Sequence, residues 1–326
     1  MNPPAGQIVD YLRLSVTDRC NYRCVYCMPP EGVPFRPHHE MLSYEEMTFF
    51  IRAAAQMGIS KVRITGGEPL VRLGLPDLVS MIRSLPKIRD ISLTTNGVLL
   101  PKFAKLLKER GLDRVNISLD SLDPERYRTL TRGGSLDAAL EGIEAALDHD
   151  LQPVKLNVVM MPELIEELPG FVALTKERPL HVRFIEWMPV GGCGPRSPSE
   201  SLHQAEVMAA LRELAADGMG DLAPVASPGG WGPARYYRIA GHAGTVGFIG
   251  SVSDHFCTEC NRLRLTADGR LKDCLFSSDE VEAGPAIRAR DEAAVRDLIR
   301  HSLEHKTFDK NVLPGRTTRS MSQVGG

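Results

Sequence analysis

The strongest constraint on the fold is a regular alternation of strand-like and helix-like segments between residues 10 and 188. Strands that alternate with amphipathic helices predict βα units and a parallel sheet. Six such units suit either an incomplete barrel or a doubly wound sheet. The predicted strands are Asp10–Thr17, Lys61–Gly66, Asp90–Thr95, Arg114–Asp120, Pro153–Met160 and His181–Trp187.

Helix-boundary signals lie between these strands. Ser43 and Glu46 form a capping box ahead of an amphipathic segment. Pro101 and Gly111 bracket a second helix in the expected order, with proline first and glycine last. Ser135 is an N-cap candidate for a third. These signals support the alternating βα pattern.

Apolar and polar residues alternate along five of the predicted strands, so one face can pack against helices while the other is polar. Closed eight-stranded barrels usually fill their interior with Val, Ile and Leu. Here the polar face carries Arg13, Arg63 and Lys155, which favours an open lumen that holds a large anionic ligand. Internal salt bridges are the alternative, although Asp120 alone cannot neutralise three cations. The sequence therefore predicts an α/β fold, an incomplete (β/α)6 barrel.

The chain after the sixth strand is predicted to form a second region. We expect residues 1–190 to form the partial barrel and residues 191–326 to form a C-terminal region with its own cysteine site. An Asp-Gly pair at 268–269 suits a type I′ hairpin turn. The predicted elements are a helix over Ser199–Ala216, loops at Gly229–Gly232 and Gly241–Gly247, a hairpin of Arg262–Leu265 with Arg270–Phe276, and a helix over Asp291–Lys306.

Composition excludes several classes of partner. Lysine and arginine together number 39 against 41 aspartates and glutamates, so no global positive field attracts nucleic acid or anionic membranes. No apolar run approaches the roughly 18–20 residues of a membrane span. The N-terminus lacks the basic and apolar segments of a signal peptide. We therefore expect a cytoplasmic protein with neither nucleic-acid nor membrane partners.

Six of the seven cysteines fall into two tight groups, and only Cys193 stands apart. Disulfides are rare in a reducing cytosol, so clustered cysteines predict a metal or redox site. Cys20, Cys24 and Cys27 follow the first predicted strand. Three thiolates in one loop can hold three irons of a [4Fe–4S] cube and leave the fourth iron open. A structural zinc site is the alternative, but zinc normally takes four ligands.

The second group consists of Cys257, Cys260 and Cys274. On spacing alone, such a set more often binds zinc. Arg262 and Arg264 follow on one face of the predicted hairpin strand, about 7 Å apart. Two guanidinium groups beside a metal site suit phosphate oxygens, while a solvated strand edge is the alternative.

Several motifs resemble those of radical S-adenosylmethionine (radical SAM) enzymes. The Cys-x3-Cys-x-aromatic-Cys loop, with Tyr26 before its third cysteine, is similar to that superfamily's signature, and Gly66-Gly67-Glu68-Pro69 resembles its glycine-rich segment. Within the superfamily, nearly the whole chain resembles the GTP 3′,8-cyclase family of molybdenum cofactor biosynthesis. The motifs of this second resemblance are LRLSVTDRCNYRCVYCMP (12–29), RITGGEPLVR (63–72), TTNG (94–97), NISLD (116–120), CTECNRLRLTADGRLKDCLF (257–276) and a terminal Gly-Gly.

The resemblance implies two [4Fe–4S] clusters, with S-adenosylmethionine and GTP as ligands. The first cluster would receive and cleave S-adenosylmethionine after reduction by an external one-electron donor, and the free iron of the second would contact the purine. The 5′-deoxyadenosyl radical would abstract hydrogen from the ribose C3′, and C3′ would then attack C8 of guanine. The product, (8S)-3′,8-cyclo-7,8-dihydroguanosine 5′-triphosphate, would pass to cyclic pyranopterin monophosphate synthase. A homodimer is a compatible assembly.

The resemblance also implies roles for individual residues. Cys20, Cys24 and Cys27 would bind the first cluster, and Cys257, Cys260 and Cys274 the second. S-adenosylmethionine would contact Tyr26, Gly67, Ser118 and Met188, with an ordinary core position as the alternative for Met188. GTP would contact Arg13, Arg63, Thr94, Lys155, Arg262 and Arg264. The catalytic residues would be Arg262, Arg264, Gly325 and Gly326. Cys193 has no counterpart and is interpreted as a small hydrophobic residue or an exposed thiol.

The terminal Gly-Gly pair has two interpretations. Standing alone, such an end is most often frayed, because glycine loses the most entropy on ordering. An incomplete barrel, however, leaves a gap that must be covered if a radical is to be shielded from solvent. We therefore expect Gly325 and Gly326 to enter the site.

Two other functions are compatible with the same residues. A peptide-modifying radical SAM maturase with an auxiliary cluster would need a peptide groove. A zinc-binding regulator would hold about two zinc ions and would not cleave S-adenosylmethionine. The cations of the predicted lumen favour a nucleotide over a peptide.

Overall fold

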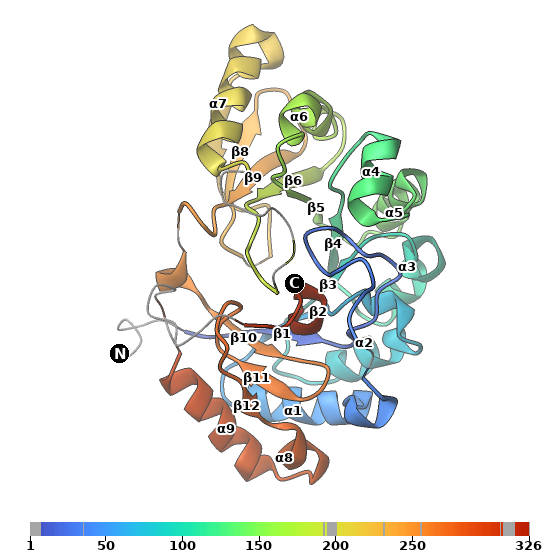
Figure 1. Cartoon of the computed structure of the whole chain (residues 1–326), viewed down its shortest axis with the longest axis vertical. Coiled ribbons are helices and arrows are strands. Elements are labelled where there is room, and N and C mark those ends of the chain that lie inside the picture. Colours follow the sequence, from blue (N-terminus) through green and yellow to red (C-terminus); the bar gives the residue numbers. More distant parts are fainter. Residues whose placement is uncertain are drawn as a thin grey trace.

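A single curved sheet contains all twelve strands of the described chain and places the N-terminal strand beside strands from the C-terminal third (Figure 1). The computed structural model describes residues 8–34, 36–191, 193, 201–230, 232–254, 256–306, 308 and 317–325. Its strands are β1 (Tyr11–Ser15), β2 (Lys61–Thr65), β3 (Asp90–Thr95), β4 (Arg114–Ser118), β5 (Val154–Val159), β6 (Leu180–Ile185), β7 (Leu222–Val225), β8 (Arg235–Ile239), β9 (Thr245–Ile249), β10 (Arg262–Leu265), β11 (Arg270–Lys272) and β12 (Val281–Glu282). Their order is β12-β11-β10-β1-β2-β3-β4-β5-β6-β9-β8-β7.

The six predicted strands are confirmed as β1 to β6, which pair in parallel in sequence order. Two further strands extend this partial barrel: β10 pairs in parallel with β1, and β9 pairs in parallel with β6. In the described part of the chain β9 and β10 do not pair with each other, so the barrel stays incomplete. The division predicted after residue 190 falls in the connection that follows β6 and stays a proposal.

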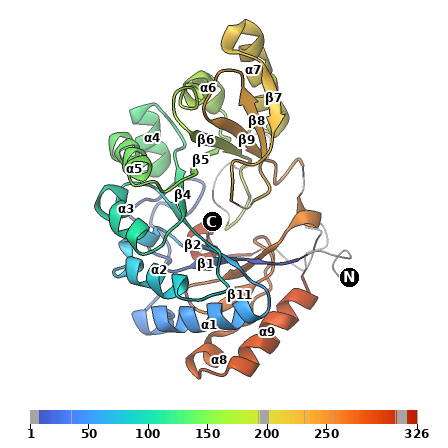
Figure 2. The same ribbon diagram turned by 180° about the vertical axis from the view of Figure 1, so that it is seen from behind.

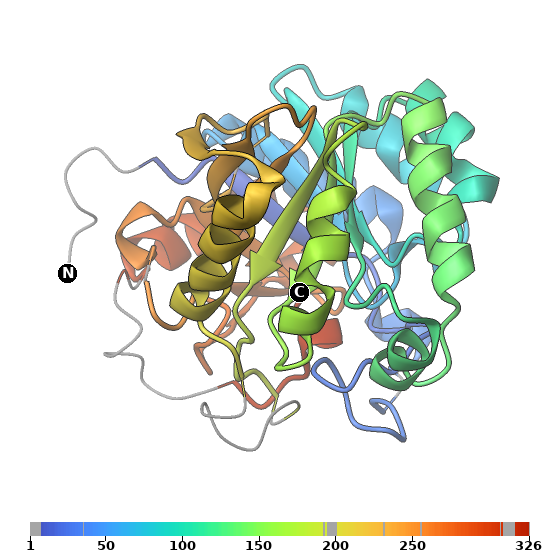
Figure 3. The same ribbon diagram turned by 90° about the horizontal axis from the view of Figure 1, so that it is seen from above.

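The helices are α1 (Tyr44–Gln56), α2 (Leu75–Arg83), α3 (Leu100–Glu109), α4 (Pro124–Thr131), α5 (Leu136–Asp148), α6 (Leu164–Ala173), α7 (Gln204–Leu214), α8 (Gly284–Arg288), α9 (Glu292–Glu304) and α10 (Met321–Val324). Helices α1 to α6 lie around the outside of the curved sheet (Figure 2). Helices α8 and α9 contact α1, and α7 lies beside α6 (Figure 3). No helix in the described ranges is long and apolar enough to cross a membrane.

The helix-boundary signals predicted between the strands of the partial barrel are confirmed. The Ser43 side chain accepts a hydrogen bond from the amide of Glu46, whose carboxylate accepts one from the amide of Ser43. Pro101 lies in the first turn of α3, and the Ser135 hydroxyl accepts a hydrogen bond from Ala138 at the start of α5. These contacts are local, which is why the sequence could predict them.

Four predictions for the C-terminal region need correction. Strand β9 starts at Thr245, inside a segment predicted as a turn, because Gly247 lies flat against the ring of Tyr236: a Cβ there would be 2.9 Å from that ring. Helix α7 starts at Gln204, five residues later than predicted. The hairpin turn is not type I′, since only Gly269 of the Asp-Gly pair has a positive φ, of 81°. Strand β11 ends at Lys272 instead of residue 276.

Candidate active site

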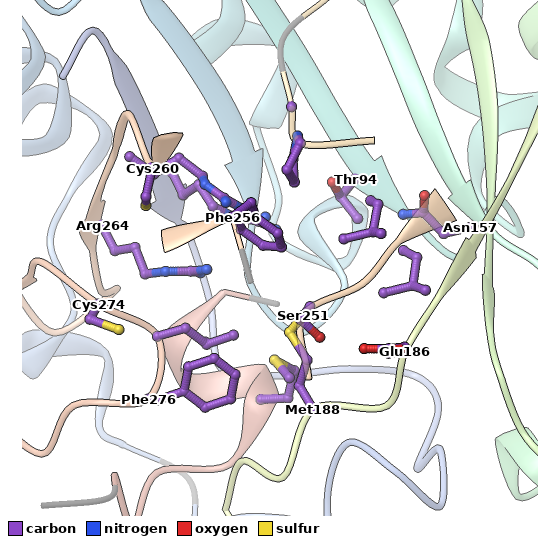
Figure 4. A pocket seen from close by; sticks show the side chains of 18 of the residues that line it. Thr94, Asn157, Glu186, Met188, Ser251, Phe256, Cys260, Arg264, Cys274 and Phe276 are labelled. Atoms are coloured by element: carbon purple, nitrogen blue, oxygen red, sulfur yellow. The ribbon is translucent and has the colours of Figure 1, made fainter. Parts of the chain in front are cut away.

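A cavity in the lumen of the partial barrel brings together most of the residues predicted to be functional (Figure 4). Of these residues, its lining includes Arg13, Tyr26, Arg63, Thr94, Ser118, Met188, Cys257, Cys260, Arg262, Arg264 and Cys274. The remaining predicted residues of the described chain lie outside this lining: Cys20, Cys24, Cys27, Gly67, Lys155 and Gly325. Gly326 lies outside the described residues.

The first cysteine loop, Cys20–Cys27, follows the carboxyl end of β1. The amides of Arg23 and Val25 donate to carbonyl oxygens at the end of α4, at 3.1 and 2.9 Å. The guanidinium group of Arg132 donates to the carbonyl oxygens of Arg23 and Met28 at 2.8 and 2.9 Å. Contacts to backbone therefore fix the shape of this loop.

The three cysteines of this loop are half-buried. Burial raises the pKa of Cys20 to about 11 and that of Cys27 to about 12, and raises the pKa of Cys24 well above its ordinary value. The thiols would need a strong local positive charge to ionise, and an iron–sulfur cluster supplies one. Within the described ranges no three potential ligands converge on one ion position. A [4Fe–4S] cube binds each thiolate through a different iron, so these residues fit it without such convergence.

The glycine pair after β2 packs against the backbone that leads into this loop. A Cβ on Gly66 would lie 2.4 Å from the carbonyl oxygen of Thr17, and one on Gly67 would lie 2.2 Å from that of Arg19. The amide of Gly67 donates to the same Thr17 oxygen at 2.7 Å. Close approach of two backbone segments therefore accounts for both glycines.

Tyr26 links the cysteine loop to the end of β4. Its hydroxyl donates to the carboxylate of Asp120 at 2.6 Å, and Asp120 also accepts a hydrogen bond from the amide of Val159 at 2.9 Å. Burial raises the pKa of Asp120 to about 6. Both Asp120 and Ser118 line the cavity beside Tyr26. From the sequence Asp120 is identifiable only as a charge, because its partner Tyr26 lies 94 residues away in the chain.

Two of the predicted lumenal cations have neutral hydrogen-bond partners. Arg63 donates to the Ser92 hydroxyl at 3.3 Å, and its guanidinium carbon lies 5.4 Å from the centre of the Tyr11 ring. Lys155 donates to the carbonyl oxygen of Gly229. Burial and then neighbouring arginines lower the pKa of Lys155 to about 6. Polyanion binding would offset this concentration of positive charge.

Internal salt bridges, the alternative considered above, occur at other lumenal cations. Arg114 forms an ion pair with Asp90, and Lys61 forms one with Asp10. Arg13 lies beside Arg63 and Arg264 in the strand register. The lumen thus contains more cations than the sequence analysis counted.

Arg183 on β6 is a cavity residue that the sequence analysis missed. It is buried and donates to the side chain of Asn116 at 2.9 Å and to that of Asn157. His181 and Arg183 do alternate with apolar neighbours, and β6 starts at Leu180. The prediction extended this strand to residue 187, which obscured the alternation.

The second cysteine group lies around the β10–β11 hairpin. Cys257 and Cys260 precede β10 and Cys274 follows β11, and the antiparallel pairing brings both positions to one end of the hairpin. Although burial acts in the opposite direction, Arg262 and Lys306 lower the pKa of Cys260 to about 7. This group therefore combines thiols with nearby cations. Lys306 also lines the cavity and was missed from the sequence.

The two cysteine groups lie at opposite ends of neighbouring parallel strands. The first follows the carboxyl end of β1, whereas Cys257 and Cys260 precede the amino end of β10. Because β1 contains five residues, the strand between the two groups is about 17 Å long at roughly 3.3 Å per residue. The cationic part of the lumen occupies this interval.

The tail occupies the centre of the curved sheet (Figure 1). The guanidinium group of Arg264 donates to the carbonyl oxygen of Gly325 at 2.8 Å, and the amide of Met321 donates to that of Cys27 at 3.2 Å. Gly325 has φ of 74°, and a Cβ there would lie 2.6 Å from the methyl group of Thr65. The described part of the tail is therefore ordered between the two cysteine groups, and its last described position requires glycine.

Arg319 holds this tail against the hairpin region. Its guanidinium group pairs with Asp268 at 3.0 Å and with Glu280 at 2.6 Å. Met188 lines the cavity and also packs with Val324 in a small apolar cluster, so its position is compatible with both interpretations of this residue. Cys193 is half-buried and lies outside the cavity lining.

Two protein-family models match successive parts of the chain. Residues 14–174 match the Radical SAM superfamily model, and residues 180–312 match the Molybdenum Cofactor Synthesis C model. SuiB of Streptococcus suis, bound to precursor peptide SuiA, superposes with a TM-score of 0.66 at 14% identity, over 94% of this chain and 69% of SuiB. At that identity the likeness shows the fold alone.

Two curated relatives are similar over nearly the whole chain. The chain is 50% identical over 323 residues to a GTP 3′,8-cyclase of Pelotomaculum thermopropionicum, and 48% identical over 326 residues to one of Heliobacterium modesticaldum. Each alignment covers 98% of this chain and 98% of the relative. On this identity and coverage, the chain belongs to the GTP 3′,8-cyclase family of the radical SAM superfamily.

Proposed function

We propose that this chain catalyses the radical SAM conversion of GTP to (8S)-3′,8-cyclo-7,8-dihydroguanosine 5′-triphosphate, the first step of molybdenum cofactor biosynthesis. The observation that carries this function is the placement of two three-cysteine groups at opposite ends of a lumen lined by arginines. A lumen of this charge suits a nucleoside triphosphate better than a peptide. Membership in the GTP 3′,8-cyclase family supports the same reaction.

Cys20, Cys24 and Cys27 would hold the first [4Fe–4S] cluster. When bound, this cluster supplies the electron that cleaves S-adenosylmethionine to the 5′-deoxyadenosyl radical. Tyr26, Gly67, Ser118 and Met188 are the proposed contacts of S-adenosylmethionine. Three of these line the lumen, and Tyr26 is held in place by Asp120. Gly67 lies outside the lining and would act through the backbone it shares with the cysteine loop.

Cys257, Cys260 and Cys274 would hold a second [4Fe–4S] cluster, which we propose leaves one iron open to the purine. Arg13, Arg63, Thr94, Lys155, Arg262 and Arg264 are the proposed contacts of GTP. The Thr94 hydroxyl is buried in the cavity wall and has no hydrogen-bond partner among the described residues. Such an orphaned donor supports a ligand at that position. The arginines would orient the triphosphate by bidentate contacts.

Arg262, Arg264, Gly325 and Gly326 are the proposed catalytic residues. The hydrogen bond from Arg264 to the carbonyl oxygen of Gly325 supports a shared position of the arginine and the tail in the lumen. There the tail would exclude water from the radical. We also propose an external one-electron donor, a homodimer, and cyclic pyranopterin monophosphate synthase as the next enzyme.

An anaerobic reconstitution tests this function. Protein loaded with iron and sulfide should contain about eight irons per chain, since two groups of three thiolates hold two cubes. With S-adenosylmethionine, a reductant and GTP deuterated at C3′, we expect the cyclised product and deuterium in 5′-deoxyadenosine. Protein that binds about two zinc ions and cleaves no S-adenosylmethionine would instead be the zinc regulator. Radical formation without transfer of the C3′ deuterium would contradict the proposed reaction.

A further inference from the structure

Tyr11 at the start of β1 has no role in the function proposed above. Its neighbours in register are Lys61 on β2 and Arg262 on β10. The side chain lines the cavity, yet only 1% of it is exposed. Its hydroxyl is buried and has no hydrogen-bond partner among the described residues. A buried hydroxyl without a partner is unfavourable, so the position calls for an acceptor.

The surroundings of this hydroxyl are cationic. The guanidinium carbon of Arg63 lies 5.4 Å from the centre of the Tyr11 ring. Although burial alone would raise the pKa of Tyr11, the charges of Arg63, Arg13 and Arg114 outweigh it and lower that pKa. Guanidinium groups donate hydrogen bonds and accept none. These arginines therefore cannot accept the proton that the phenol offers, whereas an anionic oxygen drawn to them can.

We propose that the Tyr11 hydroxyl donates a hydrogen bond to a phosphate oxygen of the nucleoside triphosphate in the lumen. This inference rests on the proposed function, which supplies GTP as the ligand. The phosphate group fits better than the guanine base, because a polyanion satisfies the phenol and the arginines together. Tyr11 is thus an additional substrate-binding residue for this reaction.

Replacing Tyr11 by phenylalanine tests the inference, because Tyr11→Phe keeps the ring beside Arg63 and removes only the hydroxyl. The probes are GTP, inorganic tripolyphosphate and guanosine, titrated calorimetrically into the reconstituted holoenzyme. We expect the affinities for GTP and tripolyphosphate to fall roughly 10-fold, as for the loss of a hydrogen bond to a charged group. Affinities for guanosine and S-adenosylmethionine should not change.

Tyr44→Phe is the matched control. Its hydroxyl donates to the carbonyl oxygen of Leu73 at 3.0 Å, outside the lumen, so its loss should leave all four affinities unchanged. Unaltered GTP and tripolyphosphate binding in Tyr11→Phe overturns the inference, and so does an equal loss for guanosine. If the unmodified protein itself binds no GTP, the proposed function fails, a result that is distinct from a negative result with Tyr11→Phe alone.

Discussion

The two cysteine groups are similar in sequence but differ in what surrounds their thiols. In the first, burial raises the pKa of Cys20 to about 11 and that of Cys27 to about 12. In the second, Arg262 and Lys306 outweigh burial and lower the pKa of Cys260 to about 7. The first group is shaped by backbone contacts and the second by cationic side chains.

This difference indicates a division of labour between the two ends of the lumen. Contacts from α4 and the glycine pair fix the first loop, and no proposed GTP contact takes part in them. Around the second group, Arg262 and Arg264 both neighbour the thiols and are proposed contacts of GTP. Substitutions at the first cysteine group should therefore stop formation of the 5′-deoxyadenosyl radical. Substitutions at the second group should leave radical formation intact and stop only the cyclisation of GTP.

Loss of one thiol from each group is the strongest test of this comparison. We expect Cys24→Ala to abolish cleavage of S-adenosylmethionine, because the first cluster loses a ligand. Cys260→Ala should still produce some 5′-deoxyadenosine but no cyclised nucleotide. The measurement is 5′-deoxyadenosine and product by chromatography, with iron content per chain. Cys193→Ala is the control and should leave all three unchanged. Equal loss of both activities in both variants would contradict the division of labour.

The C-terminal tail contacts the first cysteine loop and Arg264 beside the second group. Its removal should affect only the cyclisation of GTP. Deleting Gly325 and Gly326 should leave both clusters and S-adenosylmethionine cleavage largely intact while product falls sharply. Gly325→Ala should behave similarly, because its Cβ would meet the Thr65 methyl group at 2.6 Å. Gly218→Ala is the control: it also has a positive φ, but a Cβ there meets nothing within 4 Å. Wild-type product yield from the truncated chain would favour the frayed-terminus interpretation.

A smaller effect is expected from single cations at the second end. Arg264→Ala should weaken GTP binding at least roughly 10-fold, since a hydrogen bond to a charged group contributes about 1.5–3 kcal/mol. Affinity for S-adenosylmethionine should change little, as measured by calorimetry on the same preparation. Arg296→Ala removes an exposed guanidinium group on α9 and serves as the control. Unchanged GTP affinity in Arg264→Ala would remove this arginine from the substrate site.

The smallest expected effect is the uptake of a proton by the Lys155 amine when GTP binds. Burial and then Arg183 and Arg114 lower its pKa to about 6, so above that pH the amine is neutral in the empty protein. A bound triphosphate favours the charged form and raises the pKa again. GTP binding at pH 7.5 should therefore take up about one proton more in the wild type than in Lys155→Met. GTP affinity should correspondingly fall as pH rises from 6 to 8.

Calorimetry in HEPES and in Tris measures this uptake, because the two buffers differ in ionisation enthalpy. The difference between wild type and Lys155→Met cancels protons that GTP itself releases. Identical proton counts for the two proteins would show that Lys155 is already charged before GTP binds.

Features that depend on neighbours along the chain could be predicted from the sequence. The strands β1 to β5 follow from alternation, and the starts of α1 and α5 follow from Ser43 and Ser135. The cysteine spacing locates both groups, and strand alternation places the cations Arg13 and Arg63 on the lumenal face, where both line the cavity.

Features that depend on pairing between distant segments could not be predicted. Nothing local in β9 or β10 indicates that they add to opposite edges of the sheet. Asp120 becomes part of the site only because Tyr26 approaches it across 94 residues. Arg183 alternates with apolar neighbours within β6, but the predicted strand extended past the end of β6 and obscured this pattern. A strand boundary at residue 185 would have identified Arg183 as a lumenal residue.

The parallel pairing of β1 with β10 has a consequence for ligand size. The two cysteine groups lie at opposite ends of these strands. The length of β1 therefore sets the distance that a molecule must span to contact both groups. Removing two residues from each strand would shorten this distance by about 7 Å. A family member in which both strands were shorter would select a correspondingly shorter molecule, even if every cysteine and arginine were kept.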